Sequence, residues 1–175
     1  MSQAKFINDA LSEWGRTRPE LDLFGLGVIG RLIWSGRLAE EILERTAQVS
    51  GLRRRGDFEV LSLLRRVEPS LLTPIEVAQQ LRTSQSGMTG KLDRLEHQGL
   101  IQRRQDPDDR RAIRLGITET GRTLIDEAFD TTLRVYESMI HGFAPNEVKN
   151  LDALLAKLLT RLDELSDVRQ PWAVS

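Results

Sequence analysis

Apolar side chains follow a helical period along most of this 175-residue chain. They recur every three or four residues over 3–15 and over 21–49, which predicts two helices separated by a break at Arg18-Pro19. Period-two alternation is confined to the neighbourhood of residues 100–117. The pattern therefore predicts a mainly α-helical fold with one small β-hairpin.

A short supporting helix is expected after the connector 51–56. Asp57 is of the residue type that caps a helix, and Pro69 closes the pattern. The side chains expected to face inward are Phe58, Val60, Leu61 and Leu64.

Two more short helices are expected immediately afterwards. Thr73-Pro74-Ile75-Glu76 has the form of a capping box with proline at the first helical position. Thr83 or Ser84 caps the next helix, and Gly99 ends it in a left-handed conformation. The expected apolar faces are Ile75, Ala78 and Leu81 with Val77 beside them on the first helix, and Met88, Leu92 and Leu95 on the second.

A charged hairpin follows these two helices. Its expected strands are 100–104 and 112–117, joined by the polar loop 105–111, which carries Arg110 and Arg111 at its tip. Two short helices followed by a hairpin tipped with arginine form a winged helix-turn-helix, in which the arginines can enter a minor groove.

The second short helix has a polar outer face suited to DNA. That face carries Ser86, Gly90, Asp93, Arg94 and His97, with Gln85, Thr89 and Lys91 on its flanks. A solvated helix face is the competing interpretation. Gly87 and Gly90 weigh against it, because each costs about 1 kcal/mol relative to alanine inside a helix. Small residues let a recognition helix approach base edges closely, so DNA contact is the better interpretation.

Several runs together closely resemble the MarR family of transcriptional regulators. These runs are 72–78, 84–89, 92–96, Gly99-Leu100-Ile101, Asp106-Pro107-Asp108-Asp109-Arg110-Arg111, and Ile117-Thr118 followed by Gly121. The resemblance covers nearly the whole chain. It implies a winged-helix homodimer that represses or activates genes and often responds to a small ligand.

DNA-binding residues follow from the helix pattern and this resemblance. They are expected to be Ser84, Gln85, Ser86, Thr89, Lys91, Arg94, Arg110 and Arg111. Gly90 departs from the family, which commonly has a longer polar residue there, so base readout is expected to depend on its neighbours along the helix.

The N-terminal part also resembles the branch of this family that includes urate-responsive regulators. Trp14, the run 18–22 and Ile29-Gly30-Arg31 carry that resemblance, which implies a site for a small aromatic anion formed by Trp14, Glu59 and Arg104. The branch usually has aspartate where this chain has Glu59. The alternative is that Trp14 is a core anchor and Glu59 a surface charge, and the residues do not decide between the two.

The final helix carries a leucine-rich stripe too extensive for the thin apolar face of one terminal helix. Its members are Val148, Leu151, Leu154, Leu155, Leu158, Leu159, Leu162 and Leu165. Such a surface favours pairing with a second copy. The expected organisation is therefore N-terminal helices over 1–50 for dimerisation and a possible ligand pocket, a DNA-binding lobe over 56–118, and C-terminal dimerisation helices over 119–175.

Composition narrows the function further. The net charge is only −1, yet basic residues gather in the central stretch: Arg82, Lys91, Arg94, Arg103, Arg104, Arg110, Arg111 and Arg114. The absence of cysteine excludes disulfides, thiolate catalysis and thiol-based sensing. The two histidines lie on separate helices with no ligand spacing around them, and no phosphate-binding loop or nucleophile elbow is present. We expect neither an enzyme nor a bound metal or cofactor.

The sequence hypothesis is a DNA-binding transcriptional regulator acting as a homodimer on a pseudo-palindromic operator, with a ligand that weakens binding. No apolar run could span a membrane and no signal pattern opens the chain, so a cytoplasmic protein is expected. The first rival is a winged-helix protein-interaction module that does not bind DNA. The second is a small-molecule carrier or an enzyme.

Overall fold

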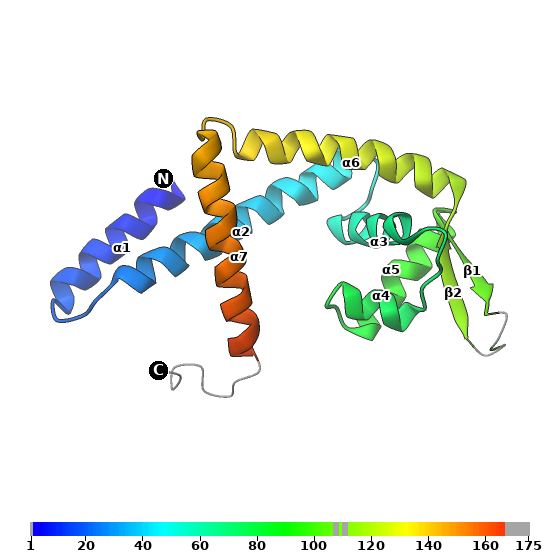
Figure 1. Cartoon of the computed structure of the whole chain (residues 1–175), viewed down its shortest axis with the longest axis horizontal. Coiled ribbons are helices and arrows are strands. Elements are labelled where there is room, and N and C mark those ends of the chain that lie inside the picture. Colours follow the sequence, from blue (N-terminus) through cyan, green and yellow to red (C-terminus); the bar gives the residue numbers. More distant parts are fainter. Residues whose placement is uncertain (1, 107–108, 110–111, 167–175) are drawn as a thin grey trace. The chain divides into compact units, whose positions relative to one another are not determined.

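The winged-helix elements predicted from the sequence are all present in the computed structural model (Figure 1). It describes residues 2–106, 109 and 112–166. The elements in order are α1 (Gln3–Thr17), α2 (Phe24–Val49), α3 (Arg55–Val67), α4 (Pro74–Gln80), α5 (Gln85–His97), β1 (Ile101–Gln105), β2 (Ile113–Ile117), α6 (Glu119–Met139) and α7 (Pro145–Ser166).

The chain forms two compact units, Met1–Leu133 and Arg134–Ser175. The first contains every element from α1 to β2 and most of α6. The expected assignment of roles to 1–50, 56–118 and 119–175 concerns function and stays a prediction.

The core of the first unit lies among α3, α4, α5, the hairpin and α6. Its largest fully buried side chains come from each of these elements: Val60, Leu61, Leu64, Val77, Met88, Leu92, Leu95, Ile101, Leu115 and Ile125. The predicted inner stripe of the second short helix, now α5, is therefore confirmed, as are three of the four predicted inward residues of α3. Phe58, the fourth, is half-buried and packs against this core.

Local capping fixes where these short helices begin. The Glu76 backbone N–H donates to Thr73 Oγ1 at 3.2 Å, and the Thr73 N–H donates to the Glu76 carboxylate at 2.7 Å. Of the two candidates for the α5 cap, Ser84 fills the role, because its Oγ accepts from the Gly87 N–H at 3.2 Å. Gly99 follows the helix with φ of 69°, a backbone conformation that glycine adopts without steric cost.

Three details differ from the sequence prediction. The long helix begins at Phe24 rather than at Leu21. Asp57 does not cap α3: Arg54 is the N-cap residue, and the Asp57 carboxylate lies inside the lobe against Arg94. Ile75 leaves 51% of its surface exposed, because the buried side of the two-turn helix α4 is formed by Val77 and Ala78.

The hairpin joins the lobe at both ends. Strands β1 and β2 pair antiparallel from Ile101↔Ile117 to Gln105↔Ile113, and Leu72 adds a single bridge to Leu115. Thr118 then caps α6, its Oγ1 accepting from the Gly121 N–H at 3.0 Å. The wing is thus attached directly to the start of a long helix.

The second unit presents the leucine-rich stripe. Within the described residues of α7 none is buried, and Leu154 and Leu159 expose 66% and 59% of their surface. Among the residues of this unit that the structure describes, none covers the apolar face.

Candidate nucleic-acid interface

The N-terminal half of α5 presents short polar side chains to solvent. Gln85, Ser86 and Thr89 are exposed, and Gly90 has no atom within 4 Å of the position that a Cβ would occupy. Thr89 Oγ1 donates to the Gln85 carbonyl at 3.1 Å. This surface has only short side chains and is rich in hydrogen-bonding groups. Such groups are needed to contact base edges in a major groove.

Arg94 occupies a different environment from these residues. Its guanidinium donates from Nη2 to Asp57 Oδ1 at 2.6 Å and from Nε to Asp57 Oδ2 at 3.4 Å. The Asp57 side chain is completely buried, whereas that of Arg94 is 25% exposed. This hydrogen bond to a carboxylate raises the pKa of the Arg94 guanidinium above its ordinary value. The predicted contact of Arg94 with DNA stays a prediction, but its guanidinium is already held by Asp57.

Sequence reasoning missed the part that Asp57 plays. Its position in the first turn of a helix was interpreted as capping, which is the commonest role for aspartate there. The available signal was an acidic residue directly before the apolar run of α3, together with an arginine on the recognition helix that could pair with it instead of contacting DNA.

Lys91 lies one turn before Arg94 on the same flank of α5. It is half-buried, and a Cβ placed on Gly56 would lie 2.9 Å from its Cε and Nζ atoms. Both residues border a charged cleft of about 420 Å³ that α2 and the start of α3 also line. Its lining residues are Glu40, Glu44, Arg54, Arg55, Gly56, Glu59, Lys91 and Arg94.

Buried and half-buried ion pairs shape the wing. Arg114 on β2 pairs with Asp106, a carboxylate only 6% exposed, which also accepts from the Asp109 N–H at 3.2 Å. Arg103 on β1 pairs with Asp93 of α5 at 2.6 Å and with Glu96 at 3.2 Å. The base of the wing is therefore tied to the recognition helix. Arg110 and Arg111, predicted at the tip, lie outside the described residues.

A second charged cluster connects α3 to α6. Arg65 donates to both oxygens of Asp126 at 3.0–3.3 Å and to Glu68 at 3.2 Å, and Arg122 donates to Glu68 at 2.6 Å. The hydrogen bond from Arg122 is the main reason that the pKa of Glu68 is lowered. The cluster holds the supporting helix of the lobe against the helix that follows the wing.

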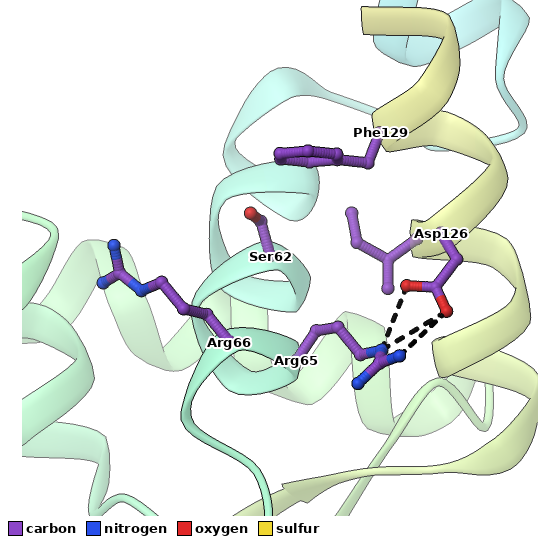
Figure 2. Close-up of a pocket in the computed structure, with 6 residues that line it drawn as sticks. Ser62, Arg65, Arg66, Asp126 and Phe129 are labelled. Carbon is purple, nitrogen blue, oxygen red and sulfur yellow. Dashed lines mark hydrogen bonds and ion pairs between the residues drawn. The ribbon is translucent and has the colours of Figure 1, made fainter. Parts of the chain in front are cut away.

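A groove of about 400 Å³ lies beside this cluster between α3 and α6 (Figure 2). Phe129 forms one wall, stacked on Phe58 with ring centroids 6.2 Å apart, and Ile125 forms part of its apolar lining. Figure 2 shows Arg65 turned toward Asp126, whereas Arg66 extends away from that pair. The groove combines an aromatic wall with cationic side chains at its edge.

The three predicted ligand-binding residues are not collected at one place within a single chain. Trp14 is 50% exposed and lines a small apolar groove of about 170 Å³ between α1 and α2, together with Phe6 and Trp34. Glu59 borders the charged cleft and pairs with Arg55 at 3.2 Å. Arg104 is exposed on β1. Their shared role stays a prediction.

The described part of the chain holds neither a metal-binding cluster nor a membrane-spanning helix. No cluster of three or more His, Asp or Glu side chains is arranged to hold a metal ion. Among the helices that the structure describes, none is both long and apolar enough to cross a membrane.

Much of the chain is similar to known proteins. The model of the MarR family matches residues 55–113, which run from α3 to the first residue of β2. The HTH-type transcriptional regulator PecS of Dickeya dadantii is 29% identical over 153 residues, covering 87% of this chain and 92% of that protein. The transcriptional repressor MprA of Escherichia coli is 30% identical over 108 residues, covering 62% of this chain and 61% of that protein.

Solved structures show the same fold. A mutant of MarR from Escherichia coli in complex with operator DNA matches with a TM-score of 0.66 and 22% identity, over 83% of this chain and 97% of that one. The fold is a winged helix-turn-helix, as the sequence predicted.

Proposed function

We infer that this chain is a DNA-binding transcriptional regulator of the MarR family, acting as a repressor on a pseudo-palindromic operator. The observation that carries this function is the division of α5 into a buried apolar stripe and an exposed polar N-terminal half. The wing stands next to that helix and is tied to it through Arg103. The similar proteins are named as transcriptional regulators and repressors, which agrees with a function other than catalysis.

DNA contact is divided between α5 and the wing in this proposal. Gln85, Ser86 and Thr89 meet base edges in a major groove, and Ser84 contacts phosphate at the helix start. Arg110 and Arg111 reach the adjacent minor groove, where a narrow A·T-rich segment has an enhanced negative potential. Lys91 and Arg94, at the edge of the charged cleft, add positive charge behind the helix.

A homodimer supplies the two-fold symmetry that a pseudo-palindrome requires. The exposed leucine face of α7 fits such an interface, because each buried leucine side chain contributes about 1.5–3 kcal/mol. Two recognition helices in successive major grooves then lie about 34–36 Å apart, one turn of B-DNA. The half-sites of the operator should show this spacing.

Selection of duplexes from a random-sequence pool tests DNA reading directly. The wild-type protein should enrich a pseudo-palindromic site and bind it far more tightly than a shuffled duplex of the same composition. Affinity should fall steeply with salt, because each neutralised phosphate contributes about 0.9 to the slope of log K against log salt. Arg110→Ala should weaken binding and leave the dimer intact. A chain that enriches no sequence would instead be the protein-interaction module considered as the rival function.

A small aromatic anion is the proposed effector. Trp14 offers a stacking surface, Arg104 a cation and Glu59 a polar contact, and bringing the three together requires more than one chain or a rearranged one. The anion releases DNA only if it binds the arrangement that cannot bind DNA more tightly, since equal affinity for both arrangements shifts nothing.

Titration of urate and other aromatic anions, followed by tryptophan fluorescence and by release of the enriched duplex, tests the effector. The combined variant Trp14→Phe with Arg104→Ala should lose the response. If that variant responds as the wild type does, the effector binds elsewhere, and the groove between α3 and α6 is the next candidate.

A further inference from the structure

Among the described residues, Asp57 is the only charged side chain with no exposed surface. A carboxylate in that position is costly unless a partner of opposite charge and further hydrogen bonds compensate for the lost water. Arg94 supplies both, because a single guanidinium engages both oxygens of the carboxylate. A two-point contact of this kind fixes orientation as well as distance.

The pair joins two helices at defined places. Asp57 lies in the first turn of α3, and Arg94 lies in the last turn of α5. One turn earlier on α5, the Lys91 side chain crosses Gly56, where the absence of a Cβ leaves room for it. The start of α3 therefore faces one flank of the recognition helix along about one turn.

Besides the pairing of Arg103 on β1 with Asp93 and Glu96, the contacts of α5 within the lobe are with the apolar core and are less directional. Met88, Leu92 and Leu95 are buried against the core, and apolar packing depends on area far more than on angle. Successive residues of a helix differ in direction by 100°, so a modest rotation of α5 would turn Ser86 and Thr89 away from a bound duplex. A directional contact on the flank is what would prevent that rotation.

We propose that Asp57 is a positioning residue for DNA recognition, which holds Arg94 and through it sets the rotation of α5 about its own axis. The inference rests on the proposed function, since it concerns how the same helix is presented to DNA. It also assigns Arg94 to the contact between α3 and α5 rather than to the bases.

The direction in which Asp57→Asn changes DNA affinity distinguishes a positioning role from a simple charge effect. The substitution removes a negative charge from a lobe that binds a polyanion, so charge alone would strengthen DNA binding. Loss of positioning does the opposite. Coupled residues in one ion-pair network change equilibria by about 2- to 150-fold, and we expect binding of the enriched duplex to weaken at least about tenfold. Discrimination against the shuffled duplex should shrink with it.

The salt dependence separates positioning from direct contact. If Arg94 touched phosphate, Arg94→Gln would lower the slope of log K against log salt by about 1. A positioning role leaves the slope close to that of the wild type while affinity for the enriched duplex falls. All affinities are measured at a temperature where circular dichroism shows each variant fully folded, so that a change in stability alone does not enter.

If Asp57→Asn alone does not fold, the double variant Asp57→Asn with Arg94→Gln can be tested instead. The double variant leaves no buried charge without a partner. It should bind DNA about as weakly as either single variant, since both changes break the same contact. Asp130→Asn is the matched control: it removes a carboxylate from an exposed position on α6 that takes no part in the contact between α3 and α5. It should retain or strengthen binding.

Each result then has one meaning. Weaker and less selective binding by Asp57→Asn, a non-additive double variant and an unchanged salt slope support the proposal. Additive losses, a slope lowered by Arg94→Gln, or full affinity in Asp57→Asn overturn it while leaving the proposed function in place. If the wild type enriches no duplex, the proposed function fails, and the role of Asp57 in DNA recognition fails with it.

Discussion

Gly121 marks the place where α6 begins against the hairpin, and Gly121→Ala should destabilise the first unit. A Cβ at this position would lie 2.0 Å from the Leu100 carbonyl oxygen and 2.9 Å from Ile117 Cγ1. The obstacle is backbone, so it cannot rotate aside as the end of a flexible side chain can. Either α6 or the start of β1 must move by about 1 Å or more to restore ordinary contact.

The displacement would also lengthen or break the hydrogen bonds that join Leu100, Thr118 and Gly121. The Leu100 oxygen accepts from the Thr118 N–H and from Thr118 Oγ1, each at 3.1 Å, and Thr118 Oγ1 accepts from the Gly121 N–H at 3.0 Å. Overpacking costs about 1–3 kcal/mol, and each hydrogen bond lost adds about 0.5–1.5 kcal/mol. The higher helix propensity of alanine offsets about 1 kcal/mol of this loss. The net expectation is a loss of about 2 kcal/mol in the free energy of unfolding.

Thermal and urea unfolding followed by circular dichroism measure this loss. A change of about 2 kcal/mol corresponds to a melting temperature lower by about 4–8 °C in a protein of this size. Gly36→Ala is the control, because this helical glycine of α2 has nothing within 4 Å of a new Cβ. It should gain up to about 1 kcal/mol. Protein concentration must be equal throughout, since dimerisation adds to stability. Equal stability of Gly121→Ala and wild type would refute the packing argument.

Three other perturbations follow from the structure. Replacing Leu155 and Leu159 with glutamate should give a monomer or insoluble protein by light scattering; a folded dimer that still binds DNA would exclude α7 as the interface. Glu68 has a lowered pKa because Arg122 donates to it, so the stability it contributes is present above about pH 4.5 and lost as pH falls through the lowered value. The melting temperatures of wild type and Glu68→Gln should therefore converge as pH falls through the acid range, and a gap that does not narrow would contradict this. Asp106→Asn should loosen the wing and weaken DNA binding with little change in the unfolding of the lobe; unchanged affinity would show that Asp106 does not shape the wing for DNA.

The sequence predicted best those features that depend on neighbouring residues. The capping box at Thr73, the cap of α5 at Thr83 or Ser84 and the turn at Gly99 depend on residues close together in the chain, so their geometry is encoded locally. The inner stripe of α5 and the pairing of β1 with β2 follow from periodicity for the same reason. These features were sufficient to define the winged helix-turn-helix.

Contacts between distant residues were not predictable in this way. Asp57 and Arg94 are 37 positions apart, and nothing in either local pattern indicates that they pair. An aspartate in the first turn of a helix favours capping on local grounds, and only the packing of α3 against α5 overrides it. The prediction that Ile75 faces inward was wrong for a related reason. A helix of two turns has too few residues for its period to show which side is buried.

The composition of α5 explains why such long-range contacts matter for its function. A helix of 13 residues is marginal in water by itself, and Gly87 and Gly90 together remove about 2 kcal/mol of helical propensity relative to alanine. The two glycines that are predicted to let the helix approach DNA closely are thus the ones that weaken it. Its stability must come from the opposite side, through Met88, Leu92 and Leu95 in the core and through Arg94 on Asp57. Substitutions on the anchored side should therefore alter DNA binding without touching any surface that meets DNA.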